Sequence, residues 1–376
     1  MRTEGGRLFG RPPLLSQRGR VILKAIMLVL GIESSCDETA AAVVRDGREL
    51  LSNVVQSQID IHKAFGGVVP EVAARSHIEV VLAVVEEALQ KAHVTWDDID
   101  AIGVTYAPGL IGSLLIGSLT ARTLAIIKNK PLYNIHHVEA HVYANFLLNP
   151  QPKFPMLSLI VSGGHSQLVL FKNHGDYTLL GQTQDDAVGE AFDKVAKIIG
   201  LPYPGGPSVS KAAELGNDRA FQFPKARMQG AYDFSFSGLK TAVLRRVQEL
   251  CGKTHDFPST QLAALLNDAT RNDLAASFQR VAIETLVDKT EKAFNDFSPA
   301  SVVIAGGVAA NGELRRQLRE RLPLQIEYAP INLCTDNAAM IATLTFYRAQ
   351  LQKPADPYTL DVVPSLSMTS LLQNAE

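Results

Sequence analysis

Apolar runs near the start of the chain predict three strands in close succession. Continuous apolar runs of about five residues indicate buried strands. They occur at 28–33, 40–44 and 51–55, with only short polar stretches between them. This spacing is typical of a β-meander and predicts that a sheet opens the fold.

Helical and strand patterns alternate through the rest of the first half. Helical spacing predicts helices over 78–89 and 110–127, and the second of these contains glycines that allow close packing. Strands are predicted over 99–105 and 132–135, and the latter leads into a cluster of histidines at the start of a helix. This order of elements is typical of an α/β chain.

The opening pattern returns roughly 130 residues later. LGIESSCDETAAAVV, from Leu30, and LIVSGGHSQLVLF, from Leu159, both read as strand, small polar turn, strand. The repetition predicts a duplicated architecture. The remaining predicted elements are an amphipathic helix over 187–199, a Pro/Gly loop over 203–207, helices to about residue 297, a strand over 301–305, a helix after Gly306 and Gly307, and a final helix beginning near Asp336.

Composition narrows the class of protein. The 376 residues predict two to three domains, and 46% hydrophobic with 20% charged residues is an ordinary globular balance. The net charge of −2 means that nucleic acid would need a local basic patch or a partner. Three cysteines without a CxxC pair indicate a reducing compartment. No stretch is predicted to span a membrane, because charge or glycine interrupts the longest apolar runs.

The first 26 residues differ from the rest in charge, because they contain six basic residues and only one acidic residue, Glu4. Two interpretations stay open. In the first, the segment is an organellar targeting peptide. In the second, it is a disordered extension or an artefact of a misassigned start site, because Met27 directly precedes the first strand. The second is favoured, and it predicts a cytoplasmic protein.

The histidine cluster HHVEAH, residues 136–141, is a candidate metal site. On a helix, His137 and His141 are four positions apart and share one face. Zinc proteases use the same spacing but need Glu directly after the first His, and Val138 fills that place here. Glu139 points to another face. A polar helix start with incidental histidines is the alternative.

Three small turns between strands are candidate phosphate sites. Small and glycine-rich turns can present backbone N–H groups to an anion without obstruction by side chains. The turns at 34–38 and 162–164 and the glycines after Ala305 fit this description. One such turn alone is more often only a turn, but three in a duplicated pattern favour a nucleotide cleft.

Nine motifs between residue 28 and about 342 carry a resemblance to the bacterial tRNA N6-adenosine threonylcarbamoyltransferase family. They are GIESSCDETAAAVV, GGVVPEVAARSH, APGLIGSLLIG, HHVEAH, VSGGHSQLVL, DDAVGEAFDKVAKIIGLPYPGGP, FSFSGLKTAV, AGGVAANGELR and CTDNAAMIA. The resemblance implies a duplicated actin-like fold of the superfamily that includes sugar kinases and Hsp70 ATPases, with a nucleotide and metal cleft between two lobes. The expected parts are a basic extension over 1–26, lobes over 27–153 and 154–350, the second with a helical insertion, and an irregular tail over 351–376.

The resemblance also implies a metal site and a reaction. His137, His141 and Asp336 would bind one divalent ion, with Fe²⁺ favoured and Zn²⁺ possible. Asp336 has an alternative role as a helix N-cap. The implied reaction transfers the threonylcarbamoyl group of threonylcarbamoyl-AMP to N6 of the adenosine next to the anticodon of tRNA.

Further residues follow from the same resemblance. The expected lining of the donor site is Ile160, Val161, Ser162, Gly163, Gly164, Asp193, Gly206 and Asn311. Its helical position alone would make Asp193 a solvent-facing residue. Asp37 and Glu38 are candidates for proton acceptor or charge organiser, with polar turn residues as the alternative.

The expected partners are tRNA, a paralogous actin-like subunit docked near the helices of the first lobe, and a small ATPase. Three other functions compete with this one. They are carbamoyl transfer to another acceptor, a non-enzymatic ATP-binding scaffold, and a metalloprotease, which the absence of HExxH opposes.

Overall fold

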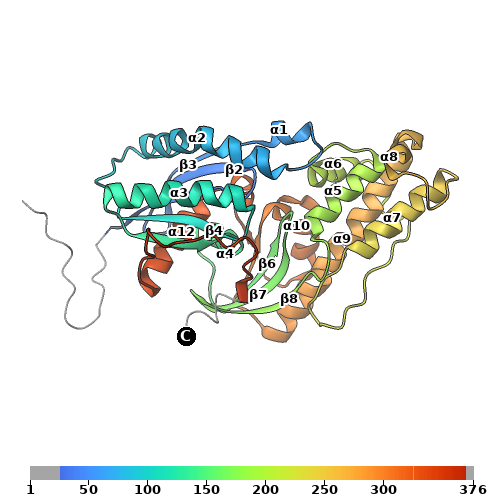
Figure 1. The fold of residues 1–376 in the computed structure, drawn as a ribbon. Helices are drawn as coiled ribbons and strands as arrows, with labels where there is room; N and C mark the ends of the chain where they lie inside the picture. The colour runs from blue at the N-terminus through green and yellow to red at the C-terminus, as the bar shows by residue number, and fades with distance from the viewer. Residues whose placement is uncertain (1–25, 325, 370–376) are drawn as a thin grey trace, which may run out of the picture.

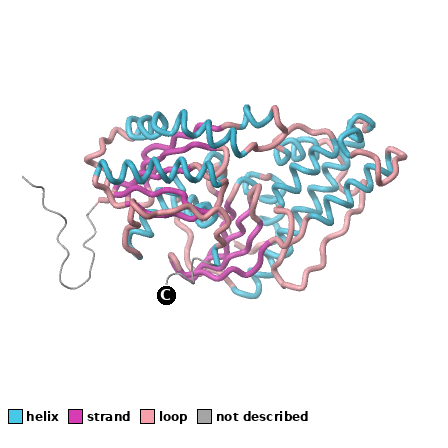
Figure 2. The backbone as a smooth tube through the Cα atoms, in the orientation of Figure 1, coloured by secondary structure: helices cyan, strands magenta, loops and turns pink. Residues whose placement is uncertain are grey.

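A five-stranded mixed sheet organises the first half of the chain (Figures 1 and 2). The computed structural model describes residues 26–324 and 326–369. The strand order is β3-β2-β1-β4-β5, in which β2 pairs antiparallel with β1 and β3, while β1, β4 and β5 run parallel. The strands are β1 (Leu28–Glu33), β2 (Glu38–Arg45), β3 (Glu49–Ser57), β4 (Ala101–Ala107) and β5 (Leu132–His136). The predicted meander is confirmed.

A second sheet repeats this topology. Its order is β10-β9-β6-β7-β8, which becomes the order of the first sheet, reversed in direction, when each strand is matched to the one five places earlier. The strands are β6 (Met156–Val161), β7 (Ser166–Asn173), β8 (Asp176–Gln182), β9 (Ser301–Ala305) and β10 (Glu327–Tyr328). The duplicated actin-like α/β architecture is therefore confirmed. The sequence pattern missed β8, which mixes polar and apolar positions, and β10, which has two residues.

Helices cover both faces of the first sheet. Alternate residues of a strand face opposite sides, so Leu30 and Ile32 of β1 pack in the cluster formed with α2, while Gly31 faces α12. The helices of this half are α1 (Ile59–Lys63), α2 (Pro70–Lys91), α3 (Ile111–Lys128), α4 (His137–Tyr143) and the 3₁₀ turn η1 (Ala144–Leu147). Although α12 (Ala338–Leu351) is the last helix, it lies on this first sheet and contacts β1 most extensively.

The second half is mainly helical around α9 (Asp268–Phe297), a 30-residue helix capped by the side chain of Asn267. Figure 1 shows α5, α7 and α9 side by side, which agrees with their contacts. The other elements are α5 (Val188–Ile199), α6 (Gly205–Ala213), α7 (Ser237–Leu250), α8 (Ser259–Leu262), η2 (Ala263–Leu265), η3 (Gly307–Ala310), α10 (Gly312–Arg321) and α11 (Ile331–Cys334).

Helix α3 is long and apolar enough to cross a membrane by length and composition, with a mean hydropathy of 1.4. One face of it packs on β4 and α2, and a core helix of a soluble protein passes the same test. About a third of its apolar window is buried. The other face leaves Ile111, Leu115 and Leu119 exposed.

The segment after α12 joins the two halves. The Val363 amide donates to Tyr106 O in β4, and the hydroxyl of Tyr177 in β8 donates to Met368 O. Residues 352–369 therefore lie along the first sheet and end against the second. The predicted extension over 1–26 falls outside the described residues apart from Ile26, and the predicted lobe boundaries stay a prediction.

We expect the contact between β1 and α12 to tolerate no side chain at Gly31. A Cβ there would lie 2.5 Å from Ala338 O and 2.6 Å from Ala342 N, both backbone atoms. Gly31→Ala should lower the free energy of unfolding by about 1–3 kcal/mol through overpacking, measured by urea denaturation. Gly238→Ala is the matched control, because no atom lies within 4 Å of its added Cβ. Equal effects of the two substitutions would contradict this account of the packing.

Candidate functional site

His136 ends β5 and caps helix α4. Its Nδ1 accepts a hydrogen bond from Glu139 N at 3.4 Å, and its Nε2 donates to Leu366 O at 3.1 Å. Burial lowers the pKa of His136 to about 3. The ring is therefore neutral and structural, and it fixes where the next residue, His137, begins the helix.

His137, His141 and Asp336 converge as the sequence predicts. The Asp336 Oδ1 atom lies 3.5 Å from His137 Nε2 and 3.3 Å from His141 Nε2. The two imidazole rings stand nearly perpendicular, with centroids 4.6 Å apart. One ligand atom from each of the three residues lies within 4.8 Å of the others. One face of α4 thus meets the start of α12, and the two helices are in contact.

Asp336 is not the N-cap of α12. Asn337 takes that role, because its side-chain oxygen accepts from Met340 N at 3.1 Å. The predicted alternative role for Asp336 is therefore wrong by one residue. With the cap supplied by its neighbour, the Asp336 carboxylate is left to face the histidines.

The three side chains suit a divalent transition metal. Both ring nitrogens of His141 are buried and form no hydrogen bond, although Nε2 lies close to Asp336. A buried polar atom without a partner is costly, and coordination would satisfy it. Two imidazoles and one carboxylate leave further positions open for a substrate. The donor set therefore fits the metal that the motif implies.

Glu33, which sequence reasoning missed, lies behind His137. Its Oε2 lies 3.0 Å from His137 Nδ1 and accepts from the Thr105 hydroxyl at 2.5 Å, while Oε1 accepts from Ser35 N at 2.5 Å. A carboxylate on the far nitrogen of a ligating histidine fixes the ring and its tautomer. The available signal was one acid at the end of a wholly apolar strand.

The opposite charges in this cluster shift one another's pKa values. Burial by itself lowers the pKa of His137, but Asp336 and Glu33 outweigh it and raise the pKa to about 9. For Asp336 the effects have the opposite sign. Burial raises the pKa of its carboxyl group, but His137 and His141 bring that pKa below its ordinary value. Two carboxylates around His137 therefore favour a cation between them, either a proton on the ring or a metal ion.

The first hairpin turn places Asp37 and Glu38 beside this cluster. His77 of α2 holds the turn, with Nε2 3.0 Å from Cys36 O and Nδ1 2.7 Å from the Thr39 hydroxyl. Burial, then Asp336, then Asp37 raise the pKa of Glu38 to about 9. The motif GGVVPEVAARSH thus has a structural purpose, because its last residue supports this turn.

The second hairpin turn has an open face. Ile160 and Val161 are buried at the end of β6, whereas Gly163 and Gly164 are exposed and have no atom within 4 Å of an added Cβ. The backbone amides of Gly189 and Glu190 donate to Ser162 O and Gly163 O and hold the turn against α5. Nothing in the protein needs glycine there for packing, which suits close approach of a ligand.

Three expected donor-site residues belong to neighbouring helices. Asp193 lies in α5, Gly206 lies in α6, and Asn311 directly precedes α10. Asp193 is partly buried and accepts from Gly205 N at 2.6 Å, so it is not the solvent-facing residue that helical position alone suggested. Gly206 has open space around it. Asn311 caps α10 through Leu314 N and donates to Ser210 and Gln279. Its amide is already used within the protein.

We expect Glu33→Gln to weaken metal binding by about 10–100-fold, because loss of the partner of a ligating histidine has that effect. The measurement is anaerobic titration of the metal-free chain with Fe²⁺ or Zn²⁺. Glu49→Gln, at the exposed start of β3, is the control and should leave the affinity unchanged. Unchanged affinity in Glu33→Gln with an unchanged melting temperature would remove Glu33 from the metal site.

Two solved structures share the fold at low sequence identity. HypF from T. kodakarensis matches with a TM-score of 0.56 and 12% identity, over 86% of this chain and 48% of that one. A full-length HypF in its phosphate- and nucleotide-bound form matches with a TM-score of 0.55 and 12% identity, over 88% and 47%. Similarity at this level concerns the fold alone.

Closer relatives share most of the sequence. A tRNA N6-adenosine threonylcarbamoyltransferase from Symbiobacterium thermophilum is 51% identical over 346 residues, covering 91% of this chain and 97% of that protein. One from Thermomicrobium roseum is 49% identical over 357 residues, covering 92% and 98%. The family model described as tRNA N6-adenosine threonylcarbamoyltransferase matches residues 49–343. With this match and these identities beside the motifs of the site, the chain belongs to the tRNA N6-adenosine threonylcarbamoyltransferase family.

Proposed function

We propose that this protein transfers the threonylcarbamoyl group from threonylcarbamoyl-AMP to N6 of the adenosine next to the anticodon of tRNA. The observation that carries the proposal is the convergence of His137, His141 and Asp336, whose ligand atoms lie within 4.8 Å of one another. Membership of a family whose members are named for this reaction supports it.

The donor would lie along the second hairpin turn. Backbone N–H groups of the open turn at Ser162, Gly163 and Gly164 suit a phosphate. Asp193 would accept hydrogen bonds from ribose hydroxyls with the oxygen that does not hold Gly205. A metal ion held by the two histidines and Asp336, with Fe²⁺ favoured over Zn²⁺, would supply Lewis acidity toward the carbamoyl oxygen.

The chain's own carboxylates would manage the proton. The N6 amine forms a bond to the carbamoyl carbon, the bond from that carbon to the phosphate oxygen breaks, and AMP leaves with the electron pair. One N6 proton must be removed in the process. Glu38 is the proposed acceptor. Its raised pKa makes its ionised carboxylate a strong base, and a metal cation beside Asp336 would favour that ionised form by offsetting the negative charge that raises the pKa. Asp37 would organise charge beside it.

The protease and scaffold alternatives lack support in the site. Glu139 cannot serve as the general base of a protease, because its carboxylate is buried and pairs with Arg348. A scaffold would have no use for the buried, unpartnered nitrogens of His141. Transfer to an acceptor other than tRNA uses the same donor chemistry, so the product of the reaction must distinguish it.

We expect threonylcarbamoyl-adenosine in tRNA incubated with the protein, its partners and threonylcarbamoyl-AMP, detected by mass spectrometry after nuclease digestion. His137→Ala should abolish the product. Glu38→Gln should lower the rate by about 10²–10⁴-fold, the usual contribution of a general base, with donor affinity retained. Consumption of the donor without modified adenosine would instead support another acceptor.

We also propose that the partner subunit docks on the groove between α2 and α3. This groove of about 350 Å³ is lined by Ile78, Val81, Leu82, Ile116, Leu119, Thr120, Thr123 and Leu124. Ile78, Leu82 and Leu119 are 61%, 59% and 49% exposed. A contiguous apolar face of this kind usually marks a protein interface. A paralogue with an equivalent pair of apolar helices would cover it.

We expect Leu119→Glu to weaken association with the partner by about 100-fold or more, because burying an unpaired carboxylate costs several kcal/mol. Titration calorimetry with the purified partner measures the change. Leu215→Glu is the matched control, since Leu215 is 76% exposed and lies beyond α6, in the other half. Equal affinity of the wild type and Leu119→Glu would place the interface elsewhere.

A further inference from the structure

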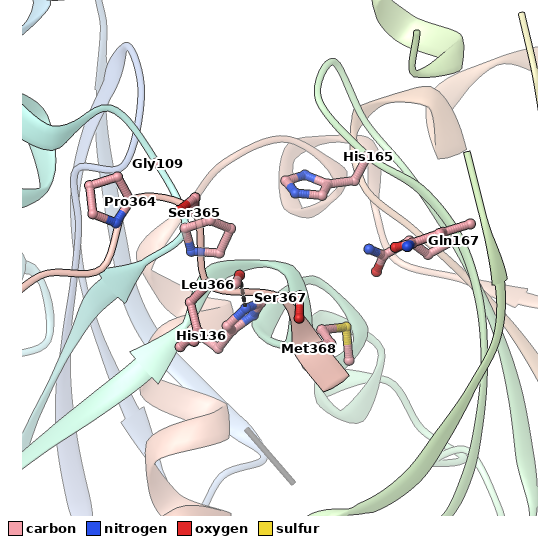
Figure 3. A pocket seen from close by; sticks show the side chains of 11 residues that line it. Gly109, His136, His165, Gln167, Pro364, Ser365, Leu366, Ser367 and Met368 are labelled. Carbon is pink, nitrogen blue, oxygen red and sulfur yellow. Dashed lines mark hydrogen bonds between the residues drawn. The ribbon is translucent and has the colours of Figure 1, made fainter. Parts of the chain in front are cut away.

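A second cavity lies beside the metal residues, between the two sheets (Figure 3). Its volume is about 390 Å³. The first half contributes Pro108, Gly109 and His136, and the second half contributes His165, Gln167 and Gln182. Residues Pro364 to Met368 of the C-terminal segment form the remaining wall. In Figure 3, His165 and Gln167 face Leu366 and Met368 across the cavity.

Gln167 is the unsatisfied polar group of this cavity. The residue is 7% exposed, and its side-chain oxygen is buried without a hydrogen-bond partner. Gln182, its cross-strand neighbour in β8, also lines the cavity, so the sheet presents two amides there. A buried oxygen without a hydrogen-bond partner destabilises the folded protein, and a ligand that donates to it would remove that cost. A rotation of the amide exchanges its oxygen and nitrogen, so a ligand can meet either a donor or an acceptor.

The cavity adjoins the metal residues. His136, which lines the cavity, directly precedes His137, and His165 lines the same cavity from the second hairpin turn. The proposed donor residues Ser162 and Gly163 precede His165 on the same turn and are bonded to α5. The second hairpin turn therefore connects the proposed donor residues to a wall of this cavity.

The shape and lining suit one nucleobase. A volume of about 390 Å³ is at the small end of the range for ligand pockets. The cavity is therefore far too small to hold a folded RNA. Apolar side chains of Pro108, Pro364, Leu366 and Met368 and the ring of His165 offer surfaces against which a base can stack. Glutamine amides pair with adenine through N6 and N7. Ser365 is exposed, so the cavity opens to solvent.

We propose that this cavity receives the acceptor adenine, turned out of the anticodon loop, and that Gln167 accepts a hydrogen bond from its N6 amine. The proposal rests on the proposed function, because it assigns the acceptor of that reaction. Bases in single-stranded loops can be turned out and read in this way. One N6 proton bonded to Gln167 orients the amine, and the other remains for transfer to the base as the new N–C bond forms. Gln167 is a positioning and recognition residue.

The test compares two anticodon stem-loop RNAs that differ only in the 6-amino group of the acceptor base. One carries adenosine and the other carries purine riboside, which lacks that group. Binding is measured with the full-length chain in its assembly with partner proteins. We expect the wild type to prefer adenosine by about tenfold, the effect of one hydrogen bond. Gln167→Met, of similar size, should bind both RNAs equally.

Gln184→Met is the control. Gln184 follows β8, is exposed and is not part of the cavity wall. It should keep the tenfold preference, and all three proteins should share one melting temperature and one affinity for threonylcarbamoyl-AMP. A preference that survives in Gln167→Met overturns the proposal, as does a wild type that binds both RNAs equally. A wild type that shows the preference but transfers nothing supports this site and removes the proposed reaction instead.

Discussion

A buried group of charges at the meeting of α4 and α12 sets the conditions for the rest of the molecule. Glu33, His137, His141 and Asp336 come from three separate segments of the sequence, and three of them are almost fully buried. Carboxylates are costly to bury unless a positive charge accompanies them. Without a metal ion, the raised pKa of His137 favours a proton on its ring as that charge. A metal ion would replace the proton, so metal binding and pH are necessarily linked at this site.

The two sheets serve to bring these groups together. Because they share one strand order, the turn between β1 and β2 in the first sheet corresponds to the turn between β6 and β7 in the second. Close approach is made possible by glycine at particular points. Gly31 admits the backbone of α12 to the first sheet. Gly306, at a φ of +88°, sits where a Cβ would lie 2.4 Å from Val161 O. The turn after β9 therefore packs directly on the second hairpin.

The proposed reaction needs a donor and an acceptor at the same carbon, and the second hairpin turn contributes to both proposed sites. Its open glycines, Gly163 and Gly164, are proposed to meet the donor, and His165 at its end lines the cavity of Gln167. The C-terminal segment, residues 352–369, bonds to the first sheet and reaches the second. It helps to enclose the cavity and supports His136, which in turn positions the first metal residue.

The sequence by itself determined every strand except β8 and β10, the repeat, and the shared face of His137 and His141, because these depend on periodicity within short stretches. It did not reveal Glu33 as the partner of His137, since an acid at the end of an apolar strand has no local signature of its contacts. The alternative role that it offered for Asp336, the helix N-cap, belongs to Asn337, one residue later, because capping depends on the exact backbone geometry at the start of α12. It gave no indication that Gln167 and Leu366, about 200 residues apart, line one cavity. Only tertiary structure decides such pairings, because packing between distant segments, and not local preference, brings them into contact.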